Sequence, residues 1–361
     1  MLRFILRRLF YGFLVLLGVV ILVFFLFNIL PGDPARMMLG QRADAESIKI
    51  ARRDLGLDKP AGVRFLNYIN DLSLVSFHNF QGDVRQREEA RDKYAPCITL
   101  FNVGESTVIA KLPYLRRSYQ SKRPVGAILA EAFPQTLLLA VVSMTIAVLL
   151  GVTIGTFSAV YNRSIFDRSA FFVSVLGMSL PSFFSAILIA WFFAFLLAPY
   201  TGLSMFGSLY TVDNLGNGEH LTLKNLILPA LTLGIRPLAV IIELTKSSML
   251  GVLKQNYIKT AFAKGLPFHR VITKHALRNA MNPVVTSVSG WFASFLGGAV
   301  FVEYIFDWKG IGVVIVNGLE KYDFPVVMGA LLVICVLLVF INIITDICYG
   351  ILDPRVRVAG D

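Results

Sequence analysis

Long uncharged stretches alternate with polar segments along this chain of 361 residues. Because a bilayer core about 30 Å thick needs roughly 20 apolar residues per helix, each stretch of that length predicts a membrane-spanning helix. The predicted spans cover residues 9–30, 135–161, 169–198, 226–245, 283–302 and 324–349. The pattern therefore predicts an all-α integral membrane protein with six transmembrane helices.

The polar segments divide the chain into three expected regions. Residues 1–32 are expected to form an N-terminal anchor helix, residues 33–131 an extracytoplasmic loop domain, and residues 132–361 a transmembrane core. The large loop carries charges of both signs, and we expect a small, α-rich domain there. Six spans place both termini on the same, cytoplasmic side.

Two features inside the spans concern helix geometry. Gly151 and Gly155 have the spacing that lets two helices pack closely. Pro181 lies within the third span and is expected to kink it. The kink either acts as a gate or only shapes the helix bundle.

The loop between the fourth and fifth spans, residues 246–283, is strongly basic. It contains seven Lys or Arg residues and no Asp or Glu. The basic residues are Lys246, Lys254, Lys259, Lys264, Arg270, Lys274 and Arg278. In a membrane protein such a loop is expected on the cytoplasmic side.

The order of residues in this loop predicts a helix, a turn and a second helix. Residues 257–264 are expected to be helical, and Gly265 stands where a left-handed residue ends a helix. Pro267 is suited to open the next helix, which is expected to continue toward Asn282.

The segment Lys259-Thr-Ala-Phe-Ala-Lys-Gly265, followed by His275-Ala-Leu-Arg-Asn-Ala280, resembles the "EAA" loop of bacterial ABC importer permeases of the dipeptide/oligopeptide branch. The broader family has Glu-Ala-Ala where this chain has Lys259, Thr260 and Ala261, whereas the peptide branch places a basic residue and a Thr there. The resemblance covers the chain except for residues 78–112, where this chain is longer. Further matching segments are residues 6–9, 27–34, 55–60, 115–125, 228–234, 245–250, 306–312, 322–327 and 352–357.

The resemblance implies a permease subunit of an ATP-driven importer in the bacterial cytoplasmic membrane, for peptides or similar small solutes. The implied partners are a second homologous permease subunit, two cytoplasmic ATPase subunits, an extracytoplasmic solute-binding protein and membrane lipid. The chain has no Gly-Lys dipeptide and hence no Walker A loop, so another chain is expected to bind ATP.

In the resembled family this loop is the coupling helix that docks on the ATPase. The expected coupling residues are Lys259, Thr260, Ala261, Phe262, Lys264, Gly265, Phe268 and Arg270. Ala261 is expected to keep the helix surface low for close approach, and Gly265 to make the turn. The cations would face an acidic or carbonyl-rich cleft, and Phe262 or Phe268 would be the apolar anchor.

Arg236 lies near the middle of the fourth span. An arginine there costs about 2.5–3.5 kcal/mol on insertion scales, so it should face a bundle interior, a partner or a wet cavity. One hypothesis is that Arg236 lines the translocation path and binds a substrate carboxylate. The alternative is a structural pair with Glu243, two turns away, for which a direct contact would have to bridge about 10 Å.

Other acidic side chains near the spans have simpler interpretations. Glu303 and Asp307, at the outer boundary of the fifth span, are expected to be solvated or to hold the outer loop. Asn342 and Asp346, in the sixth span, are expected to hydrogen-bond to neighbouring helices.

The composition, 56% hydrophobic and 16% charged, is typical of an integral membrane protein. The net charge of +11 comes from residues beside apolar spans, so we read it as a topology signal and expect no nucleic-acid binding. The three cysteines and four scattered histidines form no disulfide or metal pattern. No cofactor, metal or catalytic residue is expected in this chain.

Two other classes of protein remain as alternatives. An ion-gradient-driven secondary transporter would show inverted repeats, broken helices and carboxylates at membrane depth. The sequence has no convincing repeat, and Glu243 and Asp346 are its carboxylates near membrane depth. An intramembrane enzyme would need a Ser/His, paired Asp or metal constellation within the spans, and the sequence shows none there.

Overall fold

The computed structural model describes residues 2–28, 35–36, 44–54, 57–79, 93–103, 106–212 and 218–352. Of the expected extra segment 78–112, residues 80–92 and 104–105 fall outside the described residues, as do the tail motif beyond residue 352 and parts of the motifs at 27–34 and 55–60. The chain divides into two compact units. The first consists of Met1–Leu9, Ala132–Val313 and Val336–Asp361, and the second of Phe10–Glu131 and Val314–Cys335.

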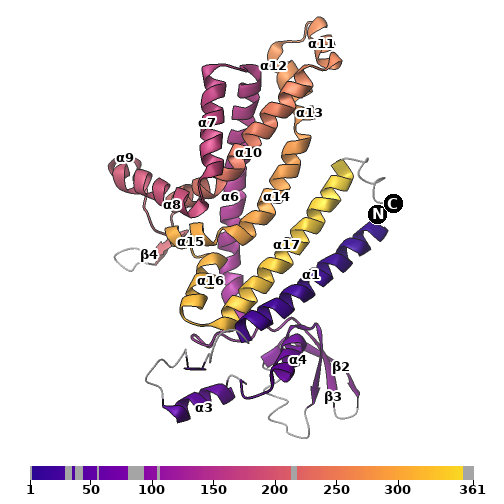
Figure 1. Cartoon of the computed structure of the whole chain (residues 1–361), viewed down its shortest axis with the longest axis vertical. Coiled ribbons are helices and arrows are strands. Elements are labelled where there is room, and N and C mark those ends of the chain that lie inside the picture. Colours follow the sequence, from indigo (N-terminus) through magenta and orange to yellow (C-terminus); the bar gives the residue numbers. More distant parts are fainter. Residues whose placement is uncertain are drawn as a thin grey trace. The chain divides into compact units, whose positions relative to one another are not determined.

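Helices make up most of the described chain, as predicted (Figure 1). The long ones are α1 (Leu2–Asn28), α6 (Val125–Val160), α7 (Ile165–Ser179), α10 (Ile227–Leu253), α14 (Asn282–Gly298) and α17 (Phe324–Leu352). The shorter α-helices are α3 (Ala45–Asp54), α4 (Ala61–Leu72), α8 (Ser182–Ile189), α9 (Ala198–Thr201), α11 (Asn256–Ala263), α12 (Phe268–Arg270), α13 (Arg278–Ala280), α15 (Val300–Phe306) and α16 (Ile311–Glu320). Two π-helical segments, η1 (Ala190–Leu196) and η3 (Val271–Leu277), and the 3₁₀ segment η2 (Leu223–Leu226) complete the set.

Four of these helices are long and apolar enough to cross a bilayer, and they match the first, second, fourth and sixth predicted spans. They are Leu6–Phe27, Val125–Val160, Leu223–Leu253 and Phe324–Thr345. A fifth candidate is the pair Ile165–Ser179 and Ser182–Leu196, which is bent by 115°. The described residues thus give four or five candidate spans, and the fifth predicted span, residues 283–302, stays a prediction, because α14 has only 17 residues.

The bend in the third predicted span lies at Pro181. Leu180, the residue before the proline, has an extended backbone with φ −81° and ψ 134°, and Pro181 itself has ψ 144°. A proline disfavours the helical conformation of the preceding residue, which accounts for the break. The predicted kink is confirmed, but it separates two helices that point in different directions.

Helix α10 is the centre of the first unit. It packs against α7, α14, α8 and α15, and 67% of its apolar window is buried. Gly151 and Gly155 of α6 face it closely: a Cβ atom at Gly155 would lie 2.6 Å from the carbonyl oxygen of Ile242. The predicted close helix packing is therefore present, between α6 and α10.

The apolar windows of the other long helices are far more exposed. Only 17% of the α1 window and 33% of the α6 and α17 windows are buried within the chain. On α7 and η1, Phe171, Phe172 and Trp191 are exposed. Such surfaces are unfavourable in water and are suited to lipid or to another membrane subunit.

The second unit contains a small sheet as well as helices. Strands β1 (Val75–Asn79), β2 (Cys97–Val103) and β3 (Ser106–Lys111) pair antiparallel in the order β1-β3-β2. In the first unit, β4 (Tyr210–Val212) and β5 (Glu219–Leu221) form a hairpin. The expectation of an all-α chain with an α-rich loop domain is wrong here, because short β-branched and aromatic runs form strands when they pair across a sheet.

Candidate functional site

The basic loop has the predicted helix-turn-helix layout, at the end of the first unit that carries α11 and α12 (Figure 1). Helix α11 is followed by Gly265 with φ +72°, a left-handed conformation that glycine adopts without strain. Pro267 precedes α12 with an extended backbone. The second helix then continues through the π-helical η3 to α13.

The two halves of the loop enclose a small apolar core. Ile258 and Ala261 of α11 pack with Val271 and Ala276 of η3, together with Met249 of α10. The Ala261 side chain is only 7% exposed. This corrects the expectation that Ala261 lies on a surface that approaches a partner: its small side chain lets α11 pack on the second helix of the loop.

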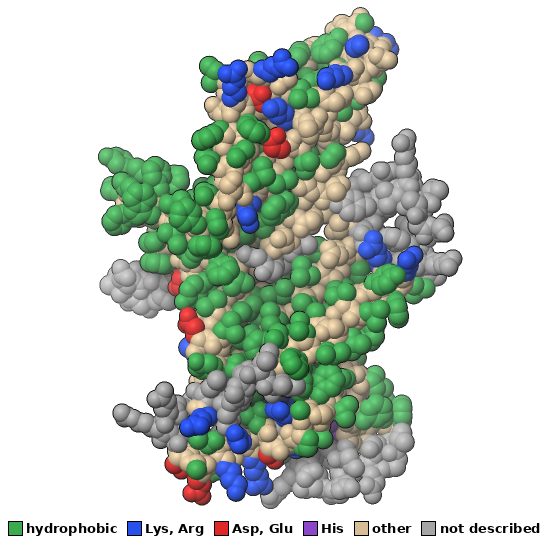
Figure 2. Space-filling model, in the orientation of Figure 1, with side chains coloured by type: hydrophobic (Ala, Val, Ile, Leu, Met, Phe, Trp, Pro, Cys, Tyr) green, Lys and Arg blue, Asp and Glu red, His purple; other side chains and the backbone are tan. Residues whose placement is uncertain are grey.

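The remaining predicted coupling residues lie on the outside of the loop. Phe262 and Phe268 are 42% and 56% exposed, and their rings stack with centroids 6.2 Å apart. The predicted residues Lys259, Thr260, Lys264, Gly265 and Arg270 are also exposed. Figure 2 shows Lys and Arg side chains gathered at this end of the unit. We call the surface formed by Lys259, Phe262, Lys264, Phe268 and Arg270 the loop face.

The structure contains an ion pair near this loop that was not predicted from the sequence. Lys246, close to the end of α10, places its Nζ 2.5 Å from Oδ1 of Asp167 in α7. The other carboxylate oxygen of Asp167 accepts a hydrogen bond from the backbone N–H of Arg163 at 2.9 Å. Both side chains are largely buried, so the pair joins α7 to α10.

Arg236 and Glu243 lie on α10 and are both half-buried. Within the described part of the chain, these two side chains form no ion pair with each other, and Oε1 of Glu243 is buried without a hydrogen-bond partner. The structural alternative of a direct Arg236–Glu243 contact is therefore not realised.

Glu303 is fully buried rather than solvated, and it holds the turn before α16. Its carboxylate accepts hydrogen bonds from the Thr136 hydroxyl at 2.7 Å and from the Gly312 N–H at 2.6 Å. Any side chain at Gly310 would collide with this carboxylate, because a Cβ there would lie 2.4 Å from its atoms. Of the two expectations for Glu303, solvation is wrong and anchoring of the loop fits the contacts.

Of the other three polar residues considered for the spans, the structure describes the side chains of Asp307 and Asn342. Asp307 has φ +51° and ends α15. Asn342 is exposed, and the side chain of Asp346 lies outside what the structure describes. Among the described residues, no group of three or more His, Cys, Asp or Glu side chains is placed to hold a metal ion.

In the second unit, Asp323 joins two segments far apart in the sequence. Its buried carboxylate accepts hydrogen bonds from the Ser118 hydroxyl at 2.5 Å and from the Tyr119 N–H at 2.9 Å. These contacts bring together the segments 115–125 and 322–327, which were two separate matches to the family pattern in the sequence. Their pairing could not be read from either segment alone.

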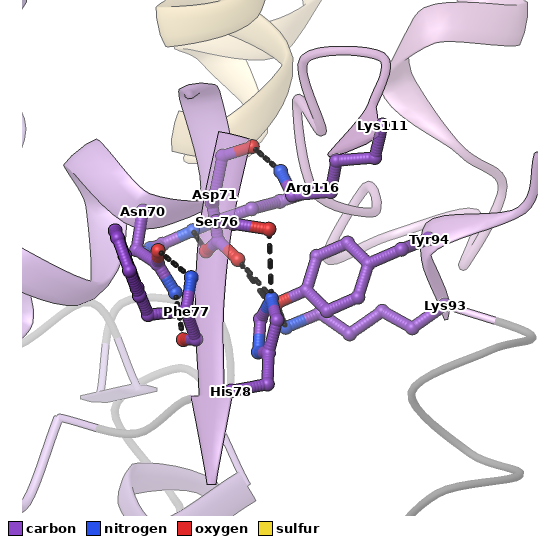
Figure 3. A network of polar contacts seen from close by, with 9 residues as sticks. All are labelled: Asn70, Asp71, Ser76, Phe77, His78, Lys93, Tyr94, Lys111 and Arg116. Atoms are coloured by element: carbon purple, nitrogen blue, oxygen red, sulfur yellow. Dashed lines mark hydrogen bonds and ion pairs between the residues drawn. The ribbon is translucent and has the colours of Figure 1, made fainter. Parts of the chain in front are cut away.

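Asp71 of α4 is the centre of a second buried polar network (Figure 3). The Tyr94 hydroxyl donates to Oδ1 at 2.8 Å, and Nε of Arg116 donates to Oδ2 at 3.2 Å. Nζ of Lys93 lies 3.4 Å from Oδ1. Burial and the neighbouring Asp71 carboxylate raise the pKa of Tyr94 well above its usual range, so the phenol stays a donor. No motif in the sequence indicated this network.

Apolar helices packed around α10, with a basic helix-turn-helix exposed at one end, are typical of a multi-pass membrane protein. The chain belongs to the family of binding-protein-dependent transport system inner membrane components. The model of that family matches residues 151–358, and the model of its N-terminal region matches residues 1–99.

Several relatives match over almost their whole length. The glutathione transport system permease protein of Salmonella typhimurium is 35% identical over 357 residues, which cover 99% of both chains. The di/tripeptide transport system permease protein of Pseudomonas aeruginosa is 34% identical over 376 residues, again 99% of both chains. In fold, the chain resembles the inward-facing MetNI methionine ABC transporter with a TM-score of 0.50 and 14% identity, covering 63% of this chain and 97% of that one.

These findings confirm the family that the loop motif indicated. The chain is a permease subunit of an ABC importer and not an ion-gradient-driven secondary transporter.

Proposed function

We propose that this chain forms part of the translocation path for peptides or similar small solutes, delivered by an extracytoplasmic binding protein. Relatives that match along their whole length are named for glutathione and for di- and tripeptides, which supports this class of solute. The loop face carries the proposal, because it is an exposed aromatic pair flanked by cations on a loop that has its own apolar core.

The loop face is the proposed docking site for a cytoplasmic ATPase. Exposed aromatic rings supply much of the binding energy of protein interfaces when a partner buries them. Lys259, Lys264 and Arg270 would meet acidic or carbonyl groups of that partner. ATP is bound and hydrolysed by two such subunits, and this chain binds no cofactor and does no covalent chemistry.

The contacts of the loop indicate how docking moves the membrane helices. Its apolar core includes Met249 of α10 and Ala159 of α6, so a displacement of α11 is transmitted directly to both helices. The Lys246–Asp167 ion pair extends the connection from α10 to α7. Closure of the ATPase dimer would thus rock helices packed around α10 and alternate access to the path.

The proposed complex pairs this chain with a second, homologous permease subunit. Each of the two subunits has six spans and cytoplasmic termini. In this chain, residues 33–131 lie on the extracytoplasmic side of the membrane. The positive-inside rule supports this orientation, because the basic loop then lies in the cytoplasm.

Arg236 and Glu243 are proposed to face the translocation path. Arg236 is half-buried on the central helix and is not neutralised by Glu243. A guanidinium in such a place can bind a carboxylate through two parallel hydrogen bonds.

The test of docking is co-purification from detergent-solubilised native membrane. We expect the wild-type chain to retain an ATPase, and the double variant Phe262→Ala/Phe268→Ala to retain about tenfold less, since two anchor rings are lost. Phe172→Ala, which removes an exposed ring from α7, is the matched control and should retain the wild-type amount. Recovery of the wild-type chain without an ATPase, or equal retention by the double variant, would contradict the proposal.

A further inference from the structure

The second unit contains a wide groove that the transport mechanism does not explain. Its volume is about 810 Å³, and it is lined by residues of α3 and α4, of β1, and of the segments around Tyr94 and 114–122. Pockets that bind small molecules usually measure about 300–1,000 Å³. The groove is therefore large enough for a solute of a few residues.

The lining is strongly cationic. Seven Lys or Arg residues and only two Asp residues line the groove. Arg117 and Lys122 are both exposed and open to a solute in the groove. Walls of one charge sign in a concave site concentrate ligands of the opposite sign.

One of the two acidic residues, Asp71, already has hydrogen-bond and ion-pair partners for both of its carboxylate oxygens. The Asp71 carboxylate is held by Tyr94, Lys93 and Arg116, as Figure 3 shows, and it is only 6% exposed. It therefore fixes two of the cations in place but does not neutralise the rest. The other, Asp58, is exposed.

The lowered pKa of His78, a residue of the groove lining, agrees with a positively charged environment. Burial lowers the pKa of His78, and the nearby Lys111 and Lys93 cations lower it further. His78 thus remains neutral at pH 7 and leaves the net charge of the lining to its Lys and Arg residues.

The uncharged part of the lining consists mostly of polar side chains, with Leu57 and Phe77 as its apolar members. The ring of Tyr114 meets that of Tyr94 edge-on, with centroids 5.3 Å apart. The Asn70 side chain exchanges two hydrogen bonds with the backbone of Phe77, at 2.9 and 3.0 Å, which fixes α4 to β1. A protein-docking surface would have an apolar centre, whereas the lining of this concave site consists mainly of phenols, amides and cations that suit a small solute.

We propose that this groove binds the carboxylate of a short peptide, with Arg117 and Lys122 as its cationic partners. The inference rests on the proposed function, because it makes the groove a site where the transported class of solute is held on the second unit. Solutes of that class carry at least one carboxylate at neutral pH. The groove is distinct from Arg236, which lies on α10 in the first unit.

The test measures binding of radiolabelled trialanine to the full chain in lipid nanodiscs by equilibrium dialysis. We expect trialanine to bind, and trialanine amide to bind about tenfold more weakly, since it lacks the carboxylate. The double variant Arg117→Gln/Lys122→Gln should bind trialanine about tenfold more weakly than wild type. Raising the salt concentration should also weaken binding to the wild-type chain.

The control variant is Lys321→Gln, which removes an exposed lysine of the same unit that does not line the groove. It should bind trialanine like wild type. Equal binding of acid and amide, or equal binding by the double variant and wild type, would overturn the proposal. A double variant that binds trialanine normally but no longer binds the solute-binding protein would also overturn it and make the groove a protein-docking surface.

This result is separate from the outcome for the proposed function. The trialanine assay contains no ATPase and no binding protein, and the Arg117→Gln/Lys122→Gln variant, which leaves Arg236 intact, distinguishes the groove from the translocation path. Failure of the ATPase to co-purify with the wild-type chain would refute docking while leaving trialanine binding unaffected.

Discussion

The hydroxyl of Thr136 lies 2.7 Å from the buried carboxylate of Glu303 and also accepts the backbone N–H of Ile311 at 2.9 Å. One side chain of α6 thus joins α15 to the first residue of α16. The indole N–H of Trp308 adds a bond to the Gln135 carbonyl at 3.0 Å. These contacts explain why the segment 306–312 needs glycines, since the backbone must pass against the carboxylate.

The first prediction concerns this buried carboxylate. Thr136→Val keeps the shape of the side chain but removes one donor to Glu303, and a buried polar group left without its partner costs about 1–3 kcal/mol. We expect a lower thermal unfolding temperature of the purified chain in detergent. Thr145→Val is the control, because the Thr145 hydroxyl bonds only to its own helix at the Val141 carbonyl and is exposed. Equal unfolding temperatures of the two variants would contradict a structural role for the Thr136–Glu303 bond.

The second prediction concerns the contact of α6 with α10. Gly155→Ala places a Cβ 2.6 Å from the Ile242 carbonyl oxygen, so the two helices must separate. Overpacking of this kind typically costs about 1–3 kcal/mol. Gly251→Ala is the matched control, because a Cβ at Gly251 has no neighbour within 4 Å. Thermal unfolding should show a loss for Gly155→Ala alone, and a Gly155→Ala chain as stable as wild type would refute this close packing.

The apolar pattern predicted most of the membrane helices for a simple physical reason. A run of about 20 uncharged residues is a strong local signal, and four candidate helices lie where such runs occur. The helix-turn-helix of the basic loop was predicted equally well, since Gly265 and Pro267 act on the backbone locally. Pro181 gave the position of the break in the third span but not its angle of 115°.

The features that the sequence did not predict depend on distant partners. Asp71 meets Arg116, and Ser118 meets Asp323, only because the chain folds back on itself. Ala261 was placed on the wrong side of its helix, because the loop's own core decides which face of α11 is buried. The β-sheet was missed because strands of five to seven residues give a weak local signal.

The third prediction concerns the ion pair between α7 and α10. Lys246→Met leaves the largely buried Asp167 carboxylate without its cation, and breaking a buried pair in this way is strongly destabilising. We expect the unfolding temperature to fall by about 4 °C or more. The double variant Asp167→Asn/Lys246→Met removes both charges and should recover part of the loss. A single variant that is no less stable than the double variant would show that the pair does not join the helices.

The fourth prediction concerns Arg236. If its guanidinium binds a solute carboxylate in the path, Arg236→Ala should lower peptide uptake by the assembled complex about tenfold or more. Arg236→Lys keeps the charge but loses the two parallel hydrogen bonds, so its uptake should be intermediate. Unchanged uptake by a normally assembled Arg236→Ala complex would assign Arg236 a structural role or none.

The central claim is that the loop face couples ATP hydrolysis to solute movement. The most direct measurement is hydrolysis and peptide uptake by the same proteoliposomes, which contain the assembled importer and loaded binding protein. Gly265→Val forces a β-branched residue to φ +72°, which strains the turn and displaces Phe268 from Phe262.

We expect this variant to lose stimulation of hydrolysis by the loaded binding protein and to lower uptake at least tenfold, while Gly251→Ala behaves like wild type. Stimulated hydrolysis and uptake at wild-type levels in Gly265→Val would contradict coupling through this loop.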